Sequence, residues 1–417
     1  MTERLLQYIW QFQYFNKAAL STVEGESLQI IYPGTHNTNQ GPDFIDAKIK
    51  INDTIWAGSI ELHIHSSNWK EHKHDGDSNY RNVVLHVVWQ HDEELHLPFS
   101  TLVLADKVPK FLLTKYDELM NAGHFIPCEK NIHLVNNLTW ISWKERLLVE
   151  RLQQRSVMIF DLLKKSNNHW EEVFWWLLAK NFGVKVNSVA FEKIAQSLPM
   201  TVLAKHKNQI QQLEALLLGQ AGLLDEEFKG KYPKLLQQEY RFLKKKYKLP
   251  KVEAPIFFLR MRPANFPSVR LAQLAMLLHC STHLFSTIKE SKSIVEVKQL
   301  LNVTANDHWH YHYRLDEATS FKKKNIGAQM IDNILINTIV PVLFAYGLYH
   351  KDEQYKERAL QWLAEITRET NSVITGFVSL QVANENAFDS QALLQLKREY
   401  CDKKRCLDCA VGNKLLK

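Results

Sequence analysis

Residues 41–65 constrain the fold of this chain more than any other stretch. They contain two runs in which apolar and polar residues alternate, 44–51 and 55–65, separated by the turn pair Asn52-Asp53. This pattern predicts a β-hairpin with one face toward the core. The core face is expected to carry Ile45, Ala47, Ile49 and Ile51 from the first strand, and Trp56, Ile60, Leu62 and Ile64 from the second.

Polar side chains on the opposite face of this hairpin form a candidate cation site. Because the side-chain period of a strand is two, Glu61, His63 and His65 project together from the second strand. Asp43 stands at the start of the first strand, after a proline that fixes the entry of the chain. The hairpin would bring Asp43 near Glu61. Two carboxylates and an imidazole at one end of a sheet suit a metal ion.

The pair Pro42-Asp43, followed by Glu61-Leu62-His63, resembles the motif of the PD-(D/E)xK nuclease superfamily. The resemblance implies that Asp43 and Glu61 hold Mg or Mn, and that the protein is a nuclease that hydrolyses phosphodiester bonds of DNA or RNA. His63 occupies the position of the lysine that helps to activate water, and it would be the substituted catalytic residue. An acidic residue on a first helix often completes such a site. Glu3, in a helix predicted over residues 2–16, is the candidate, and His65 is a further candidate ligand.

A wider set of residues resembles an uncharacterised bacterial family, domain-of-unknown-function family 2851. The shared string is GPDF…W-x-G-x-I-E-L-H…W…H-x-H-D…Y…V-x-L-H-V-V, and the resemblance extends over the whole chain. It implies no activity. The string includes His72, His74 and Asp75, in a stretch rich in metal-ligand residue types. An alternative interpretation is therefore that histidines bind a transition metal such as zinc.

The remaining patterns predict an α+β chain with three parts. Residues 1–135 form a mixed-sheet domain resembling PD-(D/E)xK proteins, residues 136–385 form a large all-α domain, and residues 386–417 form a C-terminal helix with a cysteine-rich tail. Further strands are predicted at 28–32, at 82–89, where a nearly continuous apolar run indicates burial on both faces, and at 95–104, where Pro98 indicates an edge. Helices are predicted over 143–165, 170–182, 190–198, 203–218, 235–247, 271–278, 331–346, 356–367 and 389–400.

Three of the five cysteines lie close together near the C-terminus, as Cys401-x4-Cys406-x2-Cys409. Thiolates at this spacing beside basic residues are suited to bind metal. Their order matches the first three ligands of a plant-type [2Fe–2S] site. The arrangement also resembles the iron–sulfur clamp of some nucleases in the superfamily named above, which implies Cys128 as the fourth ligand. Zinc with a histidine as fourth ligand, and reduced thiols without metal, are the alternatives.

Nucleic acid is the expected partner. The net charge of +7 is compatible with a polyanion. His36 and Asn39 lie in the polar loop 33–41 that borders the proposed site, and Arg262 and Arg270 lie in the proline-containing stretch 260–270 before a helix, where phosphate could bind. The rival interpretations are an inactive nuclease-fold protein that binds nucleic acid, and a non-enzymatic scaffold with structural metal.

The chain shows the features expected of a cytoplasmic protein. Its first residues lack the pattern of a secretory signal, and no apolar run reaches the roughly 18 residues of a membrane span. Five cysteines in 417 residues do not form a disulfide framework.

Overall fold

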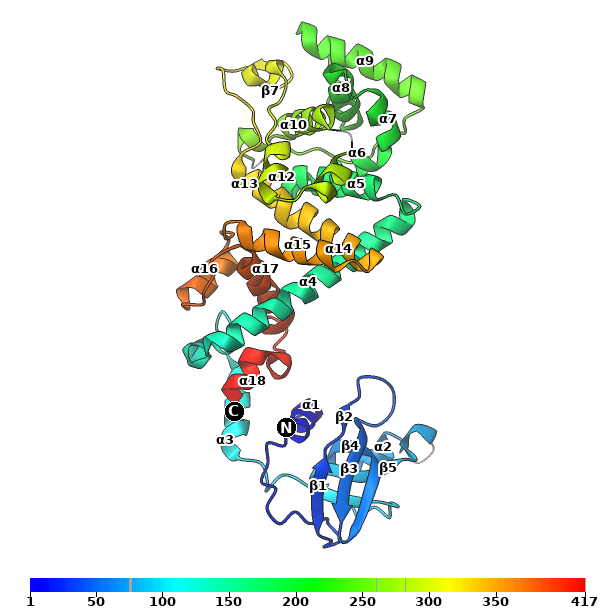
Figure 1. Ribbon diagram of the computed structural model, residues 1–417, viewed down its shortest axis with the longest axis vertical. Helices are drawn as coiled ribbons and strands as arrows, with labels where there is room; N and C mark the ends of the chain where they lie inside the picture. The colour runs from blue at the N-terminus through cyan, green and yellow to red at the C-terminus, as the bar shows by residue number, and fades with distance from the viewer. Residues whose placement is uncertain (75–76, 260, 282, 417) are drawn as a thin grey trace. The chain divides into compact units, whose positions relative to one another are not determined.

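The computed structural model describes residues 1–74, 77–259, 261–281 and 283–416. It divides into two compact units (Figure 1). Unit 1 comprises Met1–Trp143 together with Leu396–Lys417, and unit 2 comprises Lys144–Gln395. Unit 1 holds a mixed β-sheet and unit 2 is mainly helical, so the chain has the α+β character that the sequence predicts.

The sheet of unit 1 has the strand order β1-β3-β4-β5-β6, with β2 paired to β3. The pairs β1–β3 and β3–β4 are antiparallel, whereas β4–β5 and β5–β6 are parallel. Burial of β5 on both faces and the edge position of β6 confirm the predictions from the apolar run and from Pro98. The strands are β1 (Leu28–Tyr32), β2 (Thr35–His36), β3 (Phe44–Ile51), β4 (Thr54–His65), β5 (Val83–Gln90) and β6 (Ser100–Val103).

A β-bulge in β3 changes the predicted hairpin pattern. The register with β4 shifts between Phe44 and Ala47, and Asp46 adopts a left-handed backbone with φ 59°. Phe44 is consequently buried, while Ile45 is 38% exposed. The prediction that Ile45 faces the core is therefore wrong, because an extra residue in one strand moves its neighbour to the other face.

The first half of β4 is exposed, which the sequence did not indicate. Trp56, predicted to face the core, is 47% exposed. The pairing of β4 with β5 begins at Ser59, so the residues before it lack a neighbouring strand on that side. From Ser59 to Leu62 the strand is buried, and α1 packs against it.

Helix α1 (Glu3–Gln11) begins at Thr2, whose hydroxyl accepts the backbone N–H of Leu5. It is shorter than the predicted helix 2–16, because the chain turns at Gln13, which has a left-handed backbone. The other elements of unit 1 are α2 (Asn68–Glu71), η2 (Ser78–Tyr80), α3 (Lys110–Asn121), η3 (Glu129–Leu134), η7 (Leu396–Cys401), η8 (Cys406–Asp408) and α18 (Ala410–Leu416).

Unit 2 is built from helices, most of which lie where the apolar periodicity predicts them. The predicted helix 203–218 is instead two helices, since His206 bonds the side chains of Gln212 and Tyr247 at a turn between them. A short hairpin of β7 (His312–Arg314) and β8 (Glu317–Ala318) was not predicted. The helices up to this hairpin are α4 (Asn137–Lys165), α5 (Trp170–Phe182), α6 (Val184–Ser197), α7 (Met200–Lys205), α8 (Ile210–Gln220), α9 (Lys231–Tyr247), η4 (Pro263–Asn265), α10 (Pro267–Cys280), α11 (Leu284–Glu290), α12 (Ile294–Leu301) and η5 (Asp307–Tyr311).

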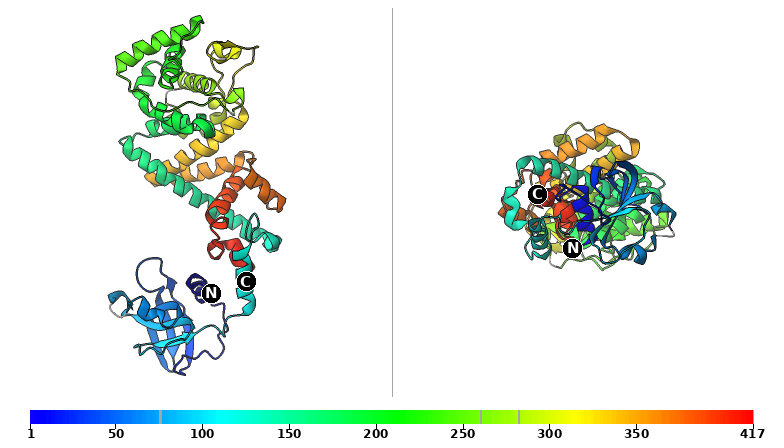
Figure 2. Two further views of the ribbon diagram at one scale, coloured as in Figure 1. Left: turned by 180° about the vertical axis from the view of Figure 1, so that it is seen from behind. Right: turned by 90° about the horizontal axis from the view of Figure 1, so that it is seen from below.

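A long apolar helix lies in the middle of unit 2, as its all-round apolar pattern predicts. It consists of α13 (Ala328–Ile334), the π-helical turn η6 (Leu335–Ile339) and α14 (Val340–His350). By length and composition this helix could cross a membrane, but 72% of its most apolar window is buried inside the protein. Helix α15 (Glu353–Glu365) lies beside α14 in the front and back views (Figures 1 and 2). Two further helices, α16 (Ser372–Ser379) and α17 (Ala387–Gln395), complete unit 2.

Candidate metal centre

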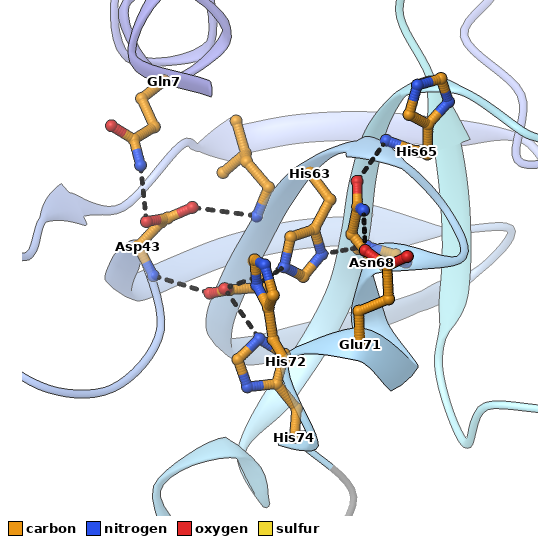
Figure 3. A network of polar contacts seen from close by, with 11 residues as sticks. Gln7, Asp43, His63, His65, Asn68, Glu71, His72 and His74 are labelled. Atoms are coloured by element: carbon orange, nitrogen blue, oxygen red, sulfur yellow. Dashed lines mark hydrogen bonds and ion pairs between the residues drawn. The ribbon is translucent and has the colours of Figure 1, made fainter. Parts of the chain in front are cut away.

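Asp43, which directly precedes β3 and is labelled in Figure 3, lies close to Glu61 of β4. The backbone N–H of Asp43 donates to Oε2 of Glu61 at 3.0 Å, and the backbone N–H of Leu62 donates to Oδ2 of Asp43 at 3.1 Å. Gln7 of α1 donates its side-chain amide to Oδ1 of Asp43 at 2.7 Å. The hairpin thus brings together the two acidic residues that the sequence singled out, and protein donors hold three of their four oxygens.

The remaining carboxylate oxygen, Oε1 of Glu61, faces imidazoles. It lies 3.6 Å from Nε2 of His63 and 3.5 Å from Nε2 of His74. Nε2 of His63 lies 3.1 Å from Nδ1 of His72. One ligand atom from each of the three histidines lies within 4.8 Å of the others. Four ligands arranged tetrahedrally at zinc–nitrogen bond lengths stand about 3.3 Å apart. The separations of 3.1, 3.5 and 3.6 Å are close to that value.

A second layer of rings orients His63. Its Nδ1 lies 2.8 Å from Nε2 of His86, a fully buried residue of β5. The indole of Trp69 in α2 packs edge-on against His63 and against His86. Histidines that ligate metals commonly bond their second nitrogen to a neighbour in this way, which leaves the first nitrogen free to bind the ion.

The loop after β4 places His72 and His74 on the same side of the chain. Between them, Lys73 has a left-handed backbone with φ 59°. The loop is anchored at its start by Asp92, which accepts hydrogen bonds from the side chain of Ser66 and from the backbone and side chain of Ser67. These bonds hold the pKa of Asp92 well below its usual range. A fixed turn, rather than a strand or helix period, therefore brings His74 to Glu61 and His72 to His63.

Burial determines the protonation of these groups. It raises the pKa of Glu61 well above that of an exposed carboxyl, and the charge of Asp43 adds to the effect. Burial likewise raises the pKa of Asp43, although the N–H of Leu62 opposes this. Burial lowers the pKa of His86 to about 3 and holds that of His63 even further below its usual range, aided by the neighbouring imidazoles. The imidazoles of His63 and His86 are therefore neutral, which is the form that binds metal.

A family model described as "Protein of unknown function (DUF2851)" matches residues 3–372. The chain belongs to this family. No curated protein and no solved structure matches the chain. The family description assigns no activity, so the function of this member has to be argued from the geometry of its site.

Two further residues were predicted as metal ligands, Glu3 and His65, and they lie differently with respect to the cluster of Glu61, His63, His72 and His74. Glu3 lies close enough for its charge to raise the pKa of both Asp43 and Glu61. His65 points away from it (Figure 3): its nearest carboxylate is Asp92, with Nδ1 3.9 Å from Oδ2, and its backbone N–H donates to Asn68.

The loop residues predicted to bind nucleic acid have local contacts. The ring of His36 packs on Phe44 with ring centroids 5.3 Å apart. The backbone N–H of Asn39 donates to Asn37, whose side chain also donates to the carbonyl of Pro42. These bonds hold the loop next to the start of β3.

The two arginines singled out in the sequence belong to unit 2. Arg262 is exposed, just before η4. Arg270 is buried in α10, where its guanidinium donates to the side chains of Gln273 and Asn265. Arg270 therefore does not present its charge to a phosphate, contrary to the prediction. The candidates Arg260 and Asp75 lie outside the described residues.

Sequence reasoning left His72 and His74 out of the principal ligand set, although it noted that their stretch is rich in ligand residue types. The available signal was the pair of histidines two positions apart in a polar segment. The role of Gln7 was not predicted from the sequence, because the pattern of an amphipathic helix does not show which of its polar residues contacts the hairpin. The cysteines that were also predicted as ligands form a separate cluster in unit 1. They are Cys128, Cys401, Cys406 and Cys409.

Proposed function

We propose that this protein is a metal-dependent hydrolase that cleaves phosphodiester bonds of nucleic acid. His63, His72, His74 and Glu61 would hold one divalent ion. The observation that carries the proposal is the spacing of their ligand atoms, because contacts of 3.1, 3.5 and 3.6 Å suit ligands that share an ion. Three imidazoles and one carboxylate favour a zinc-like ion over magnesium, which prefers oxygen ligands.

A divalent ion bound there would polarise a phosphate oxygen and lower the pKa of a bound water molecule. Asp43 is suited to accept the proton of that water, because burial raises its pKa toward neutrality and its carboxylate is fixed by Gln7 and Leu62. His86 holds the ring of His63 in place through Nδ1. Glu61 would serve as ligand through Oε1, since its Oε2 already accepts the N–H of Asp43.

The substrate class rests on two further points. The resemblance of Pro42-Asp43 and Glu61-Leu62-His63 to the PD-(D/E)xK motif supports phosphodiester chemistry, with a neutral imidazole in place of the lysine. The net charge of +7 supports a polyanionic substrate. Both points leave DNA and RNA as candidates, so both have to be assayed.

The test is a cleavage assay with single- and double-stranded DNA and RNA, in the presence of Zn, Mn or Mg. Glu61→Gln and Asp43→Asn should each lower the rate at least about 100-fold, because each removes a carboxylate from the site. The matched control is His65→Gln, which changes a histidine on the same strand that lies outside the cluster. The control should retain the rate of the unmodified protein.

Two outcomes would favour the rival interpretations. Binding of nucleic acid without cleavage at any metal concentration would support an inactive nuclease-fold protein. Absence of both binding and cleavage at low salt, where phosphate contacts are strongest, would support a scaffold in which the metal is structural.

A further inference from the structure

A second cluster of ligand-type residues lies in unit 1, apart from the imidazoles. Four of the five cysteines, all of them free thiols, converge there. Cys128 immediately precedes η3, Cys401 ends η7, Cys406 begins η8, and Cys409 follows η8. Helix α18 packs against η3, so the C-terminal segment meets a segment that lies far away in the sequence. Cys128, Cys406 and Cys409 are buried, and Cys401 is half-buried.

The surroundings of Cys409 are those of a thiolate ligand. Its sulfur accepts hydrogen bonds from the backbone N–H groups of Val411 and Gly412 and from the indole of Trp143. Gly412 is needed for this arrangement, since a Cβ at that position would come within 2.3 Å of the carbonyl oxygen of Cys406. N–H donors aimed at a sulfur stabilise its negative charge.

Positive charge also lies beside the thiols. The charge of Lys397 lies near Cys401, and that of Lys404 lies near Cys406. The thiols also lie within electrostatic range of one another, since Cys409 and Cys406 both act on Cys128. The N–H donors and the lysines around these four thiols would stabilise the negative charge of several thiolates, as a metal centre with thiolate ligands requires.

The order of the cysteines along the chain favours one kind of centre. Cys401-x4-Cys406-x2-Cys409 is the order of the first three ligands of a plant-type [2Fe–2S] cluster. Such a cluster takes four thiolates, and Cys128 supplies the fourth thiol of this group. A single zinc ion can also take four thiolates, so metal analysis distinguishes the two centres.

We propose that Cys128, Cys401, Cys406 and Cys409 bind an iron–sulfur cluster, which fastens the C-terminal segment to the segment before η3. The proposal is independent of the hydrolytic site, because the two clusters share no residue. Each thiolate would ligate iron, and the N–H groups around Cys409 would tune the charge on its sulfur.

The test uses the full chain purified without oxygen, and then reconstituted with ferrous iron and sulfide. It should be brown, absorb broadly in the visible range, and contain about two or more iron atoms per chain with a matching amount of acid-labile sulfide. Cys128→Ser and Cys409→Ser should each lose most of the iron and the colour. Two variants should keep both: Cys280→Ser, which changes the exposed cysteine of α10, and His72→Ala, which disrupts only the imidazole site.

Metal analysis of His72→Ala decides the matter even if a cysteine variant fails to fold, because the imidazole site of this variant is disrupted. One zinc per chain in His72→Ala, with no iron and no visible absorbance, overturns the proposal in favour of a zinc site at the thiols. Absence of iron, sulfide and zinc from the reconstituted variant overturns it in favour of core cysteines without metal.

Discussion

Each unit of this protein buries a glutamate, and the two glutamates differ in what surrounds them. Glu61 in unit 1 faces the imidazoles of His63 and His74 and accepts the N–H of Asp43. Glu214 in unit 2, on α8, accepts a hydrogen bond from the hydroxyl of Tyr232 at 2.7 Å, and the indole of Trp309 is a second donor beside it. Burial raises the pKa of both. A raised carboxyl pKa is therefore not by itself evidence of a metal site.

The neighbours of each glutamate determine which cation it can accept. Around Glu61, neutral imidazoles supply additional lone pairs at ligand distances, so a metal ion can replace the proton. Around Glu214, the hydroxyl of Tyr232, which itself accepts from Asn306 at 2.7 Å, and the indole of Trp309 are hydrogen-bond donors and not metal ligands. Glu214 is thus expected to carry a proton in the folded protein, whereas Glu61 is expected to exchange its proton for metal.

The largest expected difference between the Glu61 site and the Glu214 site is in the loss of zinc affinity on substitution. His72→Ala and His74→Ala each remove one of three imidazoles, and should weaken zinc binding by at least about 100-fold, more than the 10–100-fold typical of residues behind the ligands. Titration calorimetry of the protein, stripped of metal with a chelator, measures the affinity. Zinc at about 100 times its dissociation constant should stabilise the unmodified protein by about 2.7 kcal/mol.

The variant Glu214→Gln provides the matched comparison for that experiment, and should bind zinc as the unmodified protein does. Equal losses of zinc affinity in Glu214→Gln and His72→Ala would contradict the distinction between the two glutamates.

The next largest effect concerns the pH dependence of stability in unit 2. Burial raises the pKa of Glu214 to about 7 from 4.5. The folded state then binds a proton between these pH values that the unfolded state has released. The free energy of unfolding should therefore be highest below pH 4.5 and fall by about 3 kcal/mol as the pH rises to 7. Glu214→Gln, neutral at every pH, should remove this fall and be more stable than the unmodified protein at pH 8.

Urea unfolding at pH 5 and pH 8, monitored by the tryptophans of unit 2, measures this difference. The control is Glu357→Gln, which changes an exposed glutamate of α15 and should leave the pH dependence unchanged. An equal fall in stability for Glu214→Gln and the unmodified protein would show that Glu214 is ionised in the folded state.

The two sites also differ in how far the sequence could predict them. Alternation along residues 44–51 and 55–65 predicted the hairpin, and so the proximity of Asp43 and Glu61, because a period of two is a direct consequence of strand geometry. The bulge at Asp46 was not predictable, since an aspartate tolerates a left-handed backbone without requiring it.

Contacts between segments that are far apart in the sequence could not be predicted either, because no periodic pattern indicates them. The turn at Lys73 that joins His72 to His74 has no periodic signal. Glu214 lies on an apolar helix face, where only the fold reveals that Tyr232 of α9 supplies its hydrogen bond. Periodicity reports which face of an element is buried, and not which residue of another element meets it.

A smaller effect is expected from the residue that supports the metal ligands. His86→Leu removes the contact to Nδ1 of His63, and should weaken zinc binding about 10–100-fold without removing a ligand. His86→Gln keeps an amide oxygen that can accept from Nδ1–H, and should recover part of the affinity. Calorimetric zinc titrations of both variants measure the difference. Equal losses for Leu and Gln would indicate that His86 acts through packing alone.

The smallest expected effect is at the hydroxyl that contacts Glu214. Tyr232→Phe removes the donor to Oε2, and should lower the free energy of unfolding by about 1 kcal/mol. The hydrogen bond of this hydroxyl lowers the pKa of Glu214, so its loss should move the pH-dependent fall in stability to higher pH. Urea unfolding between pH 5 and pH 9 measures both changes. In the double variant with Glu214→Gln the shift should vanish, because no titrating carboxyl remains; a shift that persists would place its origin in another group of unit 2.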